Sequence, residues 1–221
     1  MNISSILKTT ILTFVKKIHE KDDIYSLVFT PSKHITYMAG QHGIFTAPGV
    51  IGLRPLSLSS SPEDKEVIIG THLRPESKFK QALSALQPGD TITMRGPILN
   101  FTLDEHTDDI VLLAQGIGIT PFRSILRHIA NTNSTVTSSL IHVDKPHHVY
   151  GSETKKLATN ADYPTTADEF SEILHTTVTL HQTAAYYISG GPKFISETKT
   201  TLIHLGIDTS SIKIDKFWGY K

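Results

Sequence analysis

Cysteine is absent from the 221-residue chain, and this absence limits the chemistry that the chain can carry. It excludes disulfide bonds, a thiolate zinc site and an iron–sulfur cluster held by this chain. Any redox centre is therefore an organic cofactor or belongs to another protein. A surplus of either charge is also lacking, because 21 Lys and Arg balance 21 Asp and Glu. This balance argues against a nucleic-acid binder, whose footprint is usually basic.

Long hydrophobic runs are missing as well. Apolar residues are frequent near the start of the chain, but Lys8 and interspersed Ser and Thr interrupt them. The run stays well short of the roughly 20 apolar residues that span a bilayer. We therefore expect neither a signal peptide nor a membrane span, and we expect a cytoplasmic protein.

The residues that are present predict a globular protein of two domains. Hydrophobic residues make up 38% of the chain and charged residues 19%, which is typical of folded proteins. The first half reads as six short strands rich in Val, Ile, Thr and aromatic residues, with a helix over residues 77–86. This pattern predicts a small antiparallel barrel. The expected strands are residues 10–19, 24–30, 43–47, 54–59, 66–73 and 91–95.

The second half alternates apolar strands with helical segments, which predicts a parallel sheet covered by helices. The boundary falls near residues 103–108, so the predicted domains are 1–103 and 108–221. The expected strands are residues 110–114, 139–143, 176–180, 185–189 and 212–217, and the expected helices are residues 121–130, 153–157, 167–174 and 193–205.

A glycine turn follows the first strand of this second half. Gly116 and Gly118 permit tight backbone geometry and close approach of a ligand, Thr120 suits a helix N-cap, and Pro121 suits the first helical position. A helix N-terminus offers unpaired N–H groups to phosphate. From this segment alone two interpretations stay open, a phosphate site or a turn that needs glycine only for packing.

A second turn of the same kind, Gly190-Gly191-Pro192, follows the strand at residues 185–189 and leads into a helix near Lys193. Ligands of open α/β sheets lie beyond the carboxyl ends of the strands. We therefore expect both turns to face one ligand.

Several motifs in order along the chain resemble the ferredoxin–NADP reductase-like flavoprotein family. The resemblance covers nearly the whole chain. In the first turn, the third glycine of the usual dinucleotide fingerprint is missing and Pro121 stands in its place. The motifs are Tyr37-Met38-Ala39-Gly40-Gln41, Arg54-Pro55-Leu56-Ser57, Pro88-Gly89-Asp90, Gly96-Pro97 and Gly116-Ile117-Gly118-Ile119-Thr120-Pro121.

The resemblance implies an antiparallel Greek-key β-barrel FAD domain followed by an α/β Rossmann-like parallel-sheet NAD(P) domain. It also implies an NAD(P)H-dependent flavoprotein reductase, in which hydride passes from nicotinamide C4 to flavin N5. Electrons then pass to a separate carrier, with ferredoxin or flavodoxin as the leading partner. Two alternatives stay open. One is a flavin or quinone reductase with a diffusible acceptor, and the other is a catalytically quiet flavin-binding electron-transfer subunit.

For FAD, the resemblance implies that Arg54 contacts the pyrophosphate and that Ser57 lies by the N5 edge, with Pro55 between them. Leu56 replaces the usual Tyr and Leu99 replaces the glycine of Gly-Pro-x-Gly. A segment that passes along the ribityl and diphosphate contributes His72, Leu73, Arg74, Ser77 and Lys80, and Ser77 also suits a helix N-cap.

For the nicotinamide nucleotide, the resemblance implies contacts from Gly116, Gly118, Thr120, Pro121, Gly190, Gly191 and Pro192, with Ser189 in the place of a Cys. Lys145 stands where the family places basic residues for the 2′-phosphate, which favours NADPH. The adjacent Asp144 is the type of residue that favours NADH.

The end of the chain is rich in aromatic residues. By resemblance, Phe217 covers the nicotinamide-facing side of the flavin, with Asp215 in the acidic place before it and Tyr220 as the second choice. A hydrophobic plug is the alternative. His142, His147 and His148 lie close together but lack metal-site spacing, so we expect no metal and place them beside the nucleotide pocket.

Overall fold

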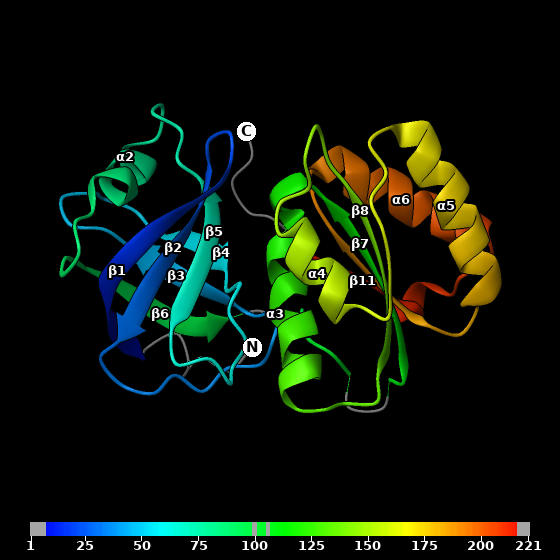
Figure 1. The fold of residues 1–221 in the computed structure, drawn as a ribbon, viewed down its shortest axis with the longest axis horizontal. Helices are drawn as coiled ribbons and strands as arrows, with labels where there is room; N and C mark the ends of the chain where they lie inside the picture. The colour runs from blue at the N-terminus through cyan, green and yellow to red at the C-terminus, as the bar shows by residue number, and fades with distance from the viewer. Residues whose placement is uncertain (1–7, 99–100, 105–106, 216–221) are drawn as a thin grey trace. The chain divides into compact units, whose positions relative to one another are not determined.

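The computed structural model describes residues 8–98, 101–104 and 107–215 (Figure 1). The chain divides into two compact units, Met1–Thr102 and Leu103–Lys221. Among the described residues, no helix has both the length and the hydropathy needed to cross a bilayer.

The first unit is a curled antiparallel sheet of six strands in the order β4-β3-β6-β1-β2-β5. This arrangement confirms the predicted antiparallel barrel and its single intervening helix. The elements are β1 (Thr9–Lys21), β2 (Ile24–Pro31), β3 (His42–Thr46), β4 (Arg54–Ser57), β5 (Val67–His72), α2 (Lys78–Ala85) and β6 (Thr91–Ile98).

One hydrophobic core fills the inside of this sheet. Alternate residues of β1 and β2, such as Leu12 and Phe29, point inward and are fully buried, as the period of a strand requires. On α2, Phe79 and Leu83 lie four residues apart, so both reach the same core from one face of the helix.

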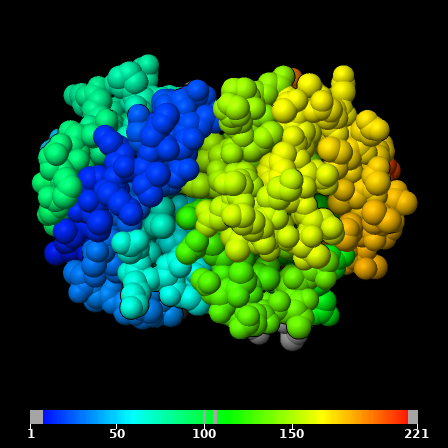
Figure 2. All heavy atoms as spheres, viewed as in Figure 1, coloured from blue at the N-terminus to red at the C-terminus, as the bar shows by residue number. Residues whose placement is uncertain are grey.

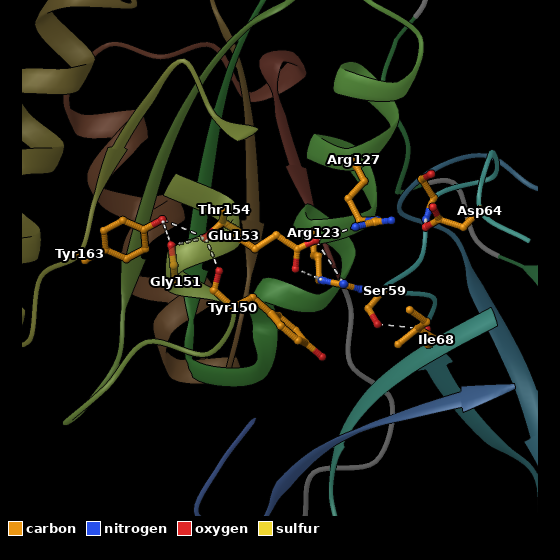
Figure 3. Close-up of polar contacts among 11 residues, drawn as sticks. Ser59, Asp64, Ile68, Arg123, Arg127, Tyr150, Gly151, Glu153, Thr154 and Tyr163 are labelled. Atoms are coloured by element: carbon orange, nitrogen blue, oxygen red, sulfur yellow. Dashed lines mark hydrogen bonds and ion pairs between the residues drawn. The ribbon is translucent and has the colours of Figure 1, made fainter. Parts of the chain in front are cut away.

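Serine side chains join the two edges of the curled sheet. The Ser59 backbone N–H and hydroxyl both donate to the Ile68 carbonyl, at 2.8 and 3.0 Å, and Figure 3 shows the hydroxyl contact. The Ser60 hydroxyl accepts from the Ile68 N–H at 3.1 Å. This seam, Ser59 and Ser60 on Ile68, supplies between β4 and β5 the hydrogen bonds that a strand ladder would otherwise make.

The second unit is a parallel five-stranded sheet in the order β11-β10-β7-β8-β9. Helices α3 and α4 cover one face and α5 and α6 the other (Figure 1). In Figure 2, α4 and α5, yellow-green to yellow, form much of the surface in view. The elements are β7 (Asp109–Gln115), η1 (Gly116–Gly118), α3 (Ile119–Asn131), β8 (Thr137–Val143), α4 (Gly151–Leu157), β9 (Asn160–Asp162), α5 (Ala167–Leu180), β10 (Ala185–Ser189), α6 (Pro192–His204), η2 (Thr209–Ser211) and β11 (Ile212–Ile214).

The strand predicted over residues 176–180 is wrong, because these residues are the last turns of α5. β-Branched residues favoured a strand there. In the helix, however, the hydroxyls of Thr176 and Thr179 donate to the carbonyls four residues earlier, at 3.2 and 3.0 Å. Val178 falls four residues after the buried Leu174 and packs on the sheet. The third strand of this half is the short β9 instead.

Candidate functional site

Three cationic side chains gather in the first unit. Arg54 begins β4, Arg74 follows β5, and Lys80 lies in the first turn of α2. The Lys80 ammonium donates to the Thr71 hydroxyl. Burial, together with the positive charges of Arg54 and Arg74, lowers the pKa of Lys80 to about 8. The three positive charges repel one another, and one carboxylate, Asp23, pairs with Arg74, so the cluster suits an added phosphate.

One carboxylate, Asp23, holds two of the predicted cofactor residues in place. His72 Nδ1 lies 2.6 Å from Asp23 Oδ1, and Arg74 Nε donates to Asp23 Oδ2 at 3.0 Å. Burial alone would raise the pKa of Asp23, but these two partners outweigh it and lower the pKa. The Leu73 N–H donates to the Asp23 carbonyl at 2.8 Å. Sequence reasoning missed Asp23, whose partners lie about 50 positions away.

The predicted cap at Ser77 is confirmed. The Ser77 hydroxyl accepts from the Lys80 N–H at 3.4 Å and begins α2. The N-terminal turn of α2 therefore lies at the cation cluster, since Lys80 belongs to both.

Ser57, predicted to lie at the reactive edge of the flavin, is buried and paired with a histidine. Its hydroxyl lies 3.0 Å from His42 Nε2, and the two residues face each other across β3 and β4. His42 was not singled out from the sequence, although it directly follows the Gly40-Gln41 motif. Pro55 is half-buried in β4, and Leu56 packs against the barrel core.

In the second unit, the two glycines of the first turn serve different purposes. Gly116 has a φ of +52° and open space around a Cβ, so it supplies the left-handed conformation. A Cβ on Gly118 would lie 2.4 Å from the Ser189 carbonyl oxygen and 2.9 Å from the Gly190 nitrogen. Gly118 is therefore required for packing one turn on the other.

The start of the helix after this turn differs from the prediction. The 3₁₀ turn η1 carries the helical path back to Gly116, so α3 begins at Ile119. Thr120 is thus no N-cap, and its hydroxyl donates instead to the Ile117 carbonyl at 3.0 Å. Pro121 is the third residue of α3, whereas Pro192 is the first residue of α6.

The two turns meet at the carboxyl ends of β7 and β10, where the strand order reverses. The Gly191 N–H donates to Gln115 Oε1 at 3.3 Å. Beside them lies a cavity of about 740 Å³, which Lys145 borders and which Phe170 and Phe194 line with apolar surface. Open α/β sheets bind ligands at this reversal point.

Asp144 lies on the same cavity, but its carboxylate already serves the loop that it begins. Oδ1 accepts from the Lys145 N–H at 2.8 Å and Oδ2 from the Val149 N–H at 3.4 Å. Asp144, the type of residue that would select free ribose hydroxyls, therefore already accepts two hydrogen bonds from its own loop. The Lys145 side chain, in contrast, is exposed.

A buried polar pair lies at the carboxyl ends of β10 and β11. The Ser189 hydroxyl donates to Asp215 Oδ2 at 3.2 Å, and both residues are almost fully buried. The Asp215 N–H extends the sheet by donating to the Ile188 carbonyl at 2.9 Å. The predicted roles of Phe217 and Tyr220, and the departure at Leu99, lie outside the described residues.

Two of the three clustered histidines contact each other, and His147 is exposed. The rings of His142 and His148 meet edge to face, with centroids 5.3 Å apart, and Tyr163 joins them. His142 Nε2 donates to the Gly116 carbonyl at 2.9 Å. In the described part of the chain, no group of three His, Asp or Glu residues is placed to hold a metal ion.

An ion-pair network fastens α3 to α4 (Figure 3). Arg123, 8% exposed, donates through Nε and Nη2 to the Glu153 carboxylate at 2.8 and 3.2 Å, and Arg127 Nη1 donates to it at 2.7 Å. Burial raises the pKa of Glu153, but the two guanidinium groups outweigh it and lower the pKa. The Arg123 guanidinium also lies 4.8 Å from the Tyr150 ring centroid. The network thus ties α3, the helix after the glycine turn, to α4.

A Ser–His–Asp arrangement at the opposite end of the sheet is structural. Ser139 Oγ lies 3.2 Å from His181 Nε2, and His181 Nδ1 lies 2.8 Å from Asp109 Oδ2. Ser139, however, is a buried residue of β8, which pairs with strands on both sides. Its neighbouring N–H groups are used by the sheet, so no oxyanion site is formed. The trio ties the end of α5 to the sheet.

No family model matches the chain. Curated relatives match one part of it. They include the sulfhydrogenase 1 subunit gamma of Pyrococcus furiosus, 38% identical over 92 residues, which are 41% of this chain and 31% of the relative. They also include the 2-halobenzoate 1,2-dioxygenase electron transfer component of Burkholderia cepacia, 31% identical over 107 residues, 48% of this chain and 32% of the relative. The matched segments span about a third of the length of these relatives.

Solved structures match nearly the whole chain. A ferredoxin–NADP⁺ reductase from Neisseria gonorrhoeae with bound FAD and NADP has a TM-score of 0.79 at 19% identity, covering 96% of this chain and 99% of that one. A flavohemoglobin from Malassezia yamatoensis with bound FAD and heme has a TM-score of 0.79 at 22% identity, covering 95% and 60%. The chain therefore has the fold of the ferredoxin–NADP reductases, as the resemblance predicted.

Proposed function

We propose that this chain, which has the ferredoxin–NADP reductase fold, is an FAD-dependent oxidoreductase that takes hydride from NAD(P)H and passes electrons to a separate carrier such as ferredoxin or flavodoxin. The observation that carries the proposal is a separate place for phosphate in each unit, the cation cluster in the first and the paired glycine turns in the second. Flavin supplies the chemistry that joins a two-electron donor to a one-electron acceptor.

In the first unit, Arg54, Arg74 and Lys80 hold the FAD diphosphate. Burial and the charges of Arg54 and Arg74, of which Arg74 is paired with Asp23, lower the pKa of Lys80, and three neighbouring cations fit a ligand with two phosphates better than a neutral one. Ser57 presents its hydroxyl at the reactive edge of the ring. His42 fixes the orientation of that hydroxyl from across the strand pair.

In the second unit, the turns after β7 and β10 receive the nicotinamide nucleotide, with its adenosine part in the adjoining cavity. Lys145 faces a 2′-phosphate, and the committed carboxylate of Asp144 supports NADPH over NADH. Ser189 and Asp215 form the polar pair nearest the second turn and help to align the nicotinamide, since hydride transfer needs alignment and no protein nucleophile.

The acceptor lies outside this chain, because a chain without cysteine holds no iron–sulfur cluster of its own. Relatives named as an electron transfer component and as a reductase component of oxygenases support a carrier protein or an oxygenase over a diffusible acceptor.

The test is stopped-flow mixing of the FAD-loaded protein with NADPH and, separately, NADH, followed through the visible flavin band. Rapid bleaching, then reoxidation by added ferredoxin or flavodoxin, supports the proposal. A protein that binds FAD but is bleached by neither nucleotide is the quiet electron-transfer subunit instead. A protein that takes up no FAD contradicts the proposal altogether.

A further inference from the structure

His142 lies in β8 opposite Ala114 of β7, one strand away from the first glycine turn, and is fully buried. Its Nε2 lies 2.9 Å from the Gly116 carbonyl oxygen. A carbonyl oxygen only accepts, so the proton of this contact is on His142 Nε2. The same oxygen accepts the Ile119 N–H that closes the 3₁₀ turn. Both of its lone pairs are therefore used.

The hydrogen bond from His142 also fixes the next N–H of the turn. In a planar trans peptide the C=O and N–H groups point in opposite directions. With the Gly116 carbonyl directed at His142, the Ile117 N–H is directed away from His142. Ile117 lies in the first turn of the helical path, where N–H groups have no partner within the helix.

Side-chain packing does not fix the left-handed conformation of Gly116, because nothing lies within 4 Å of the position of a Cβ. The orientation of this peptide therefore depends on the hydrogen bonds to its carbonyl, from His142 and from the Ile119 N–H. The imidazole, in contrast, is held firmly. His148 and Tyr163 pack around it, His148 Nε2 donates to the Pro164 carbonyl at 3.0 Å, and the Tyr163 hydroxyl donates to the Gly151 carbonyl at 3.0 Å.

We propose that His142 is a positioning residue for the nicotinamide nucleotide, which holds the Gly116 turn in the shape that receives the diphosphate. The inference rests on the proposed function, because it takes the cavity bordered by Gly116 as the nucleotide site. His142 touches no reacting atom. It acts through the Gly116 peptide and lowers the conformational cost of binding.

The experiment compares His142→Leu, which removes the donor, with His142→Gln, whose side-chain amide restores a donor. His181→Leu is the matched control, since it removes another hydrogen-bonded histidine of the same unit, far from the turn. The readouts are the Kd for NADP⁺ by calorimetry, and KM and kcat for NADPH with the FAD-loaded protein.

We expect His142→Leu to raise the Kd and KM about tenfold, the size of one lost hydrogen bond with its buried acceptor, while kcat changes less than about twofold. His142→Gln regains most of the affinity, and His181→Leu keeps it. Equal affinity in His142→Leu and wild type overturns the inference. So does loss of affinity in His142→Leu that His142→Gln fails to restore, because it points to packing alone.

A second measurement covers failure of the leucine variant to fold. Nitrogen NMR of wild type reports a protonated His142 Nε2, and saturating NADP⁺ shifts its resonance together with the Gly116 and Ile117 amides. Measured NADP⁺ binding with unmoved resonances overturns the inference and leaves the proposed function standing. Absence of any binding of NADP⁺ or NAD⁺ to wild type contradicts the proposed function itself.

Discussion

The positive charge of Lys80 lowers the stability of the FAD-free protein, although the same charge would favour binding of a diphosphate. Its ammonium is held beside Arg54 and Arg74, and its pKa is lowered from 10.5 to about 8. Between these two values the unfolded chain binds a proton that the folded protein has released. The free energy of unfolding therefore increases with pH across this window. Charge that would help to bind a diphosphate thus weakens the empty fold.

Replacing Lys80 tests this directly. We expect Lys80→Met to flatten the rise in unfolding free energy between about pH 8 and 10, measured by urea unfolding without FAD. Lys78→Met is the control, because Lys78 is exposed on the same helix and should leave the pH profile unchanged. Parallel profiles for wild type and Lys80→Met would contradict the buried cation.

Of the three cations, we expect the neighbouring Arg54 to contribute most to FAD binding. Arg54→Ala should weaken FAD binding by about 1.5–3 kcal/mol, the scale of a charge-assisted contact, as measured by fluorescence titration. Arg95→Ala, an exposed arginine on β6, should bind FAD as wild type does. Unchanged affinity in Arg54→Ala would remove Arg54 from the site.

Lys145 determines the expected choice between the two nucleotides. Because this lysine is exposed, its contact with a 2′-phosphate is worth about 0.2–1 kcal/mol. Lys145→Ala should therefore lower kcat/KM for NADPH about two- to fivefold and leave that for NADH unchanged. Lys155→Ala, on the exposed side of α4, is the control. An equal ratio of the two constants in Lys145→Ala and wild type assigns nucleotide choice elsewhere.

At the scale of elements, the contact between the two turns predicts different effects of alanine at Gly118 and at Gly116. Gly118→Ala forces Cβ against the Ser189 backbone and should cost about 1–3 kcal/mol of unfolding free energy, as overpacking does. It should also weaken NADP⁺ binding, since it parts the turns. Gly116→Ala meets no atom and should cost about 1–2 kcal/mol through its left-handed φ alone. The reverse order of stability, by thermal unfolding, would contradict this assignment.

Elements were predictable from the sequence where local pattern and tertiary packing agree. Burial alternates along the first half of β1, which ends just before Asp22, and β2 ends at Pro31. The strand and glycine turn around Gly116 likewise have a strong local signature. The strand expected over residues 176–180 failed because helix periodicity and the capping box of Thr166 with Glu169 outweigh the preference of β-branched residues.

The candidate site was predictable only in part. Residues within a motif, such as Arg54 and Gly118, were found because the motif itself places them. Asp23 and His42 were missed because their partners come from strands distant in sequence, and single-strand patterns carry no sign of the pairing. The burial of Lys80 was likewise missed, since it follows from packing and not from the sequence around it.

At the scale of the whole molecule, each unit has its own hydrophobic core. We expect two unfolding transitions in calorimetry, with FAD raising the one that belongs to residues 1–102 and NADP⁺ raising the other, since a ligand stabilises the state that binds it. Hydrogen exchange assigns each transition to its unit. A single transition that both ligands raise equally would show that the units unfold together.

The seam of Ser59 and Ser60 on Ile68 has a consequence for handling the protein in concentrated solution. An unpaired edge strand of a sheet can pair with an edge strand of a second molecule, and this is a common route to insoluble aggregates. The hydroxyls of Ser59 and Ser60 pair with the carbonyl and the N–H of Ile68. These two backbone groups are therefore not open to a strand of a second molecule. We therefore expect Ser59 and Ser60 to protect this part of the sheet from association with a second molecule.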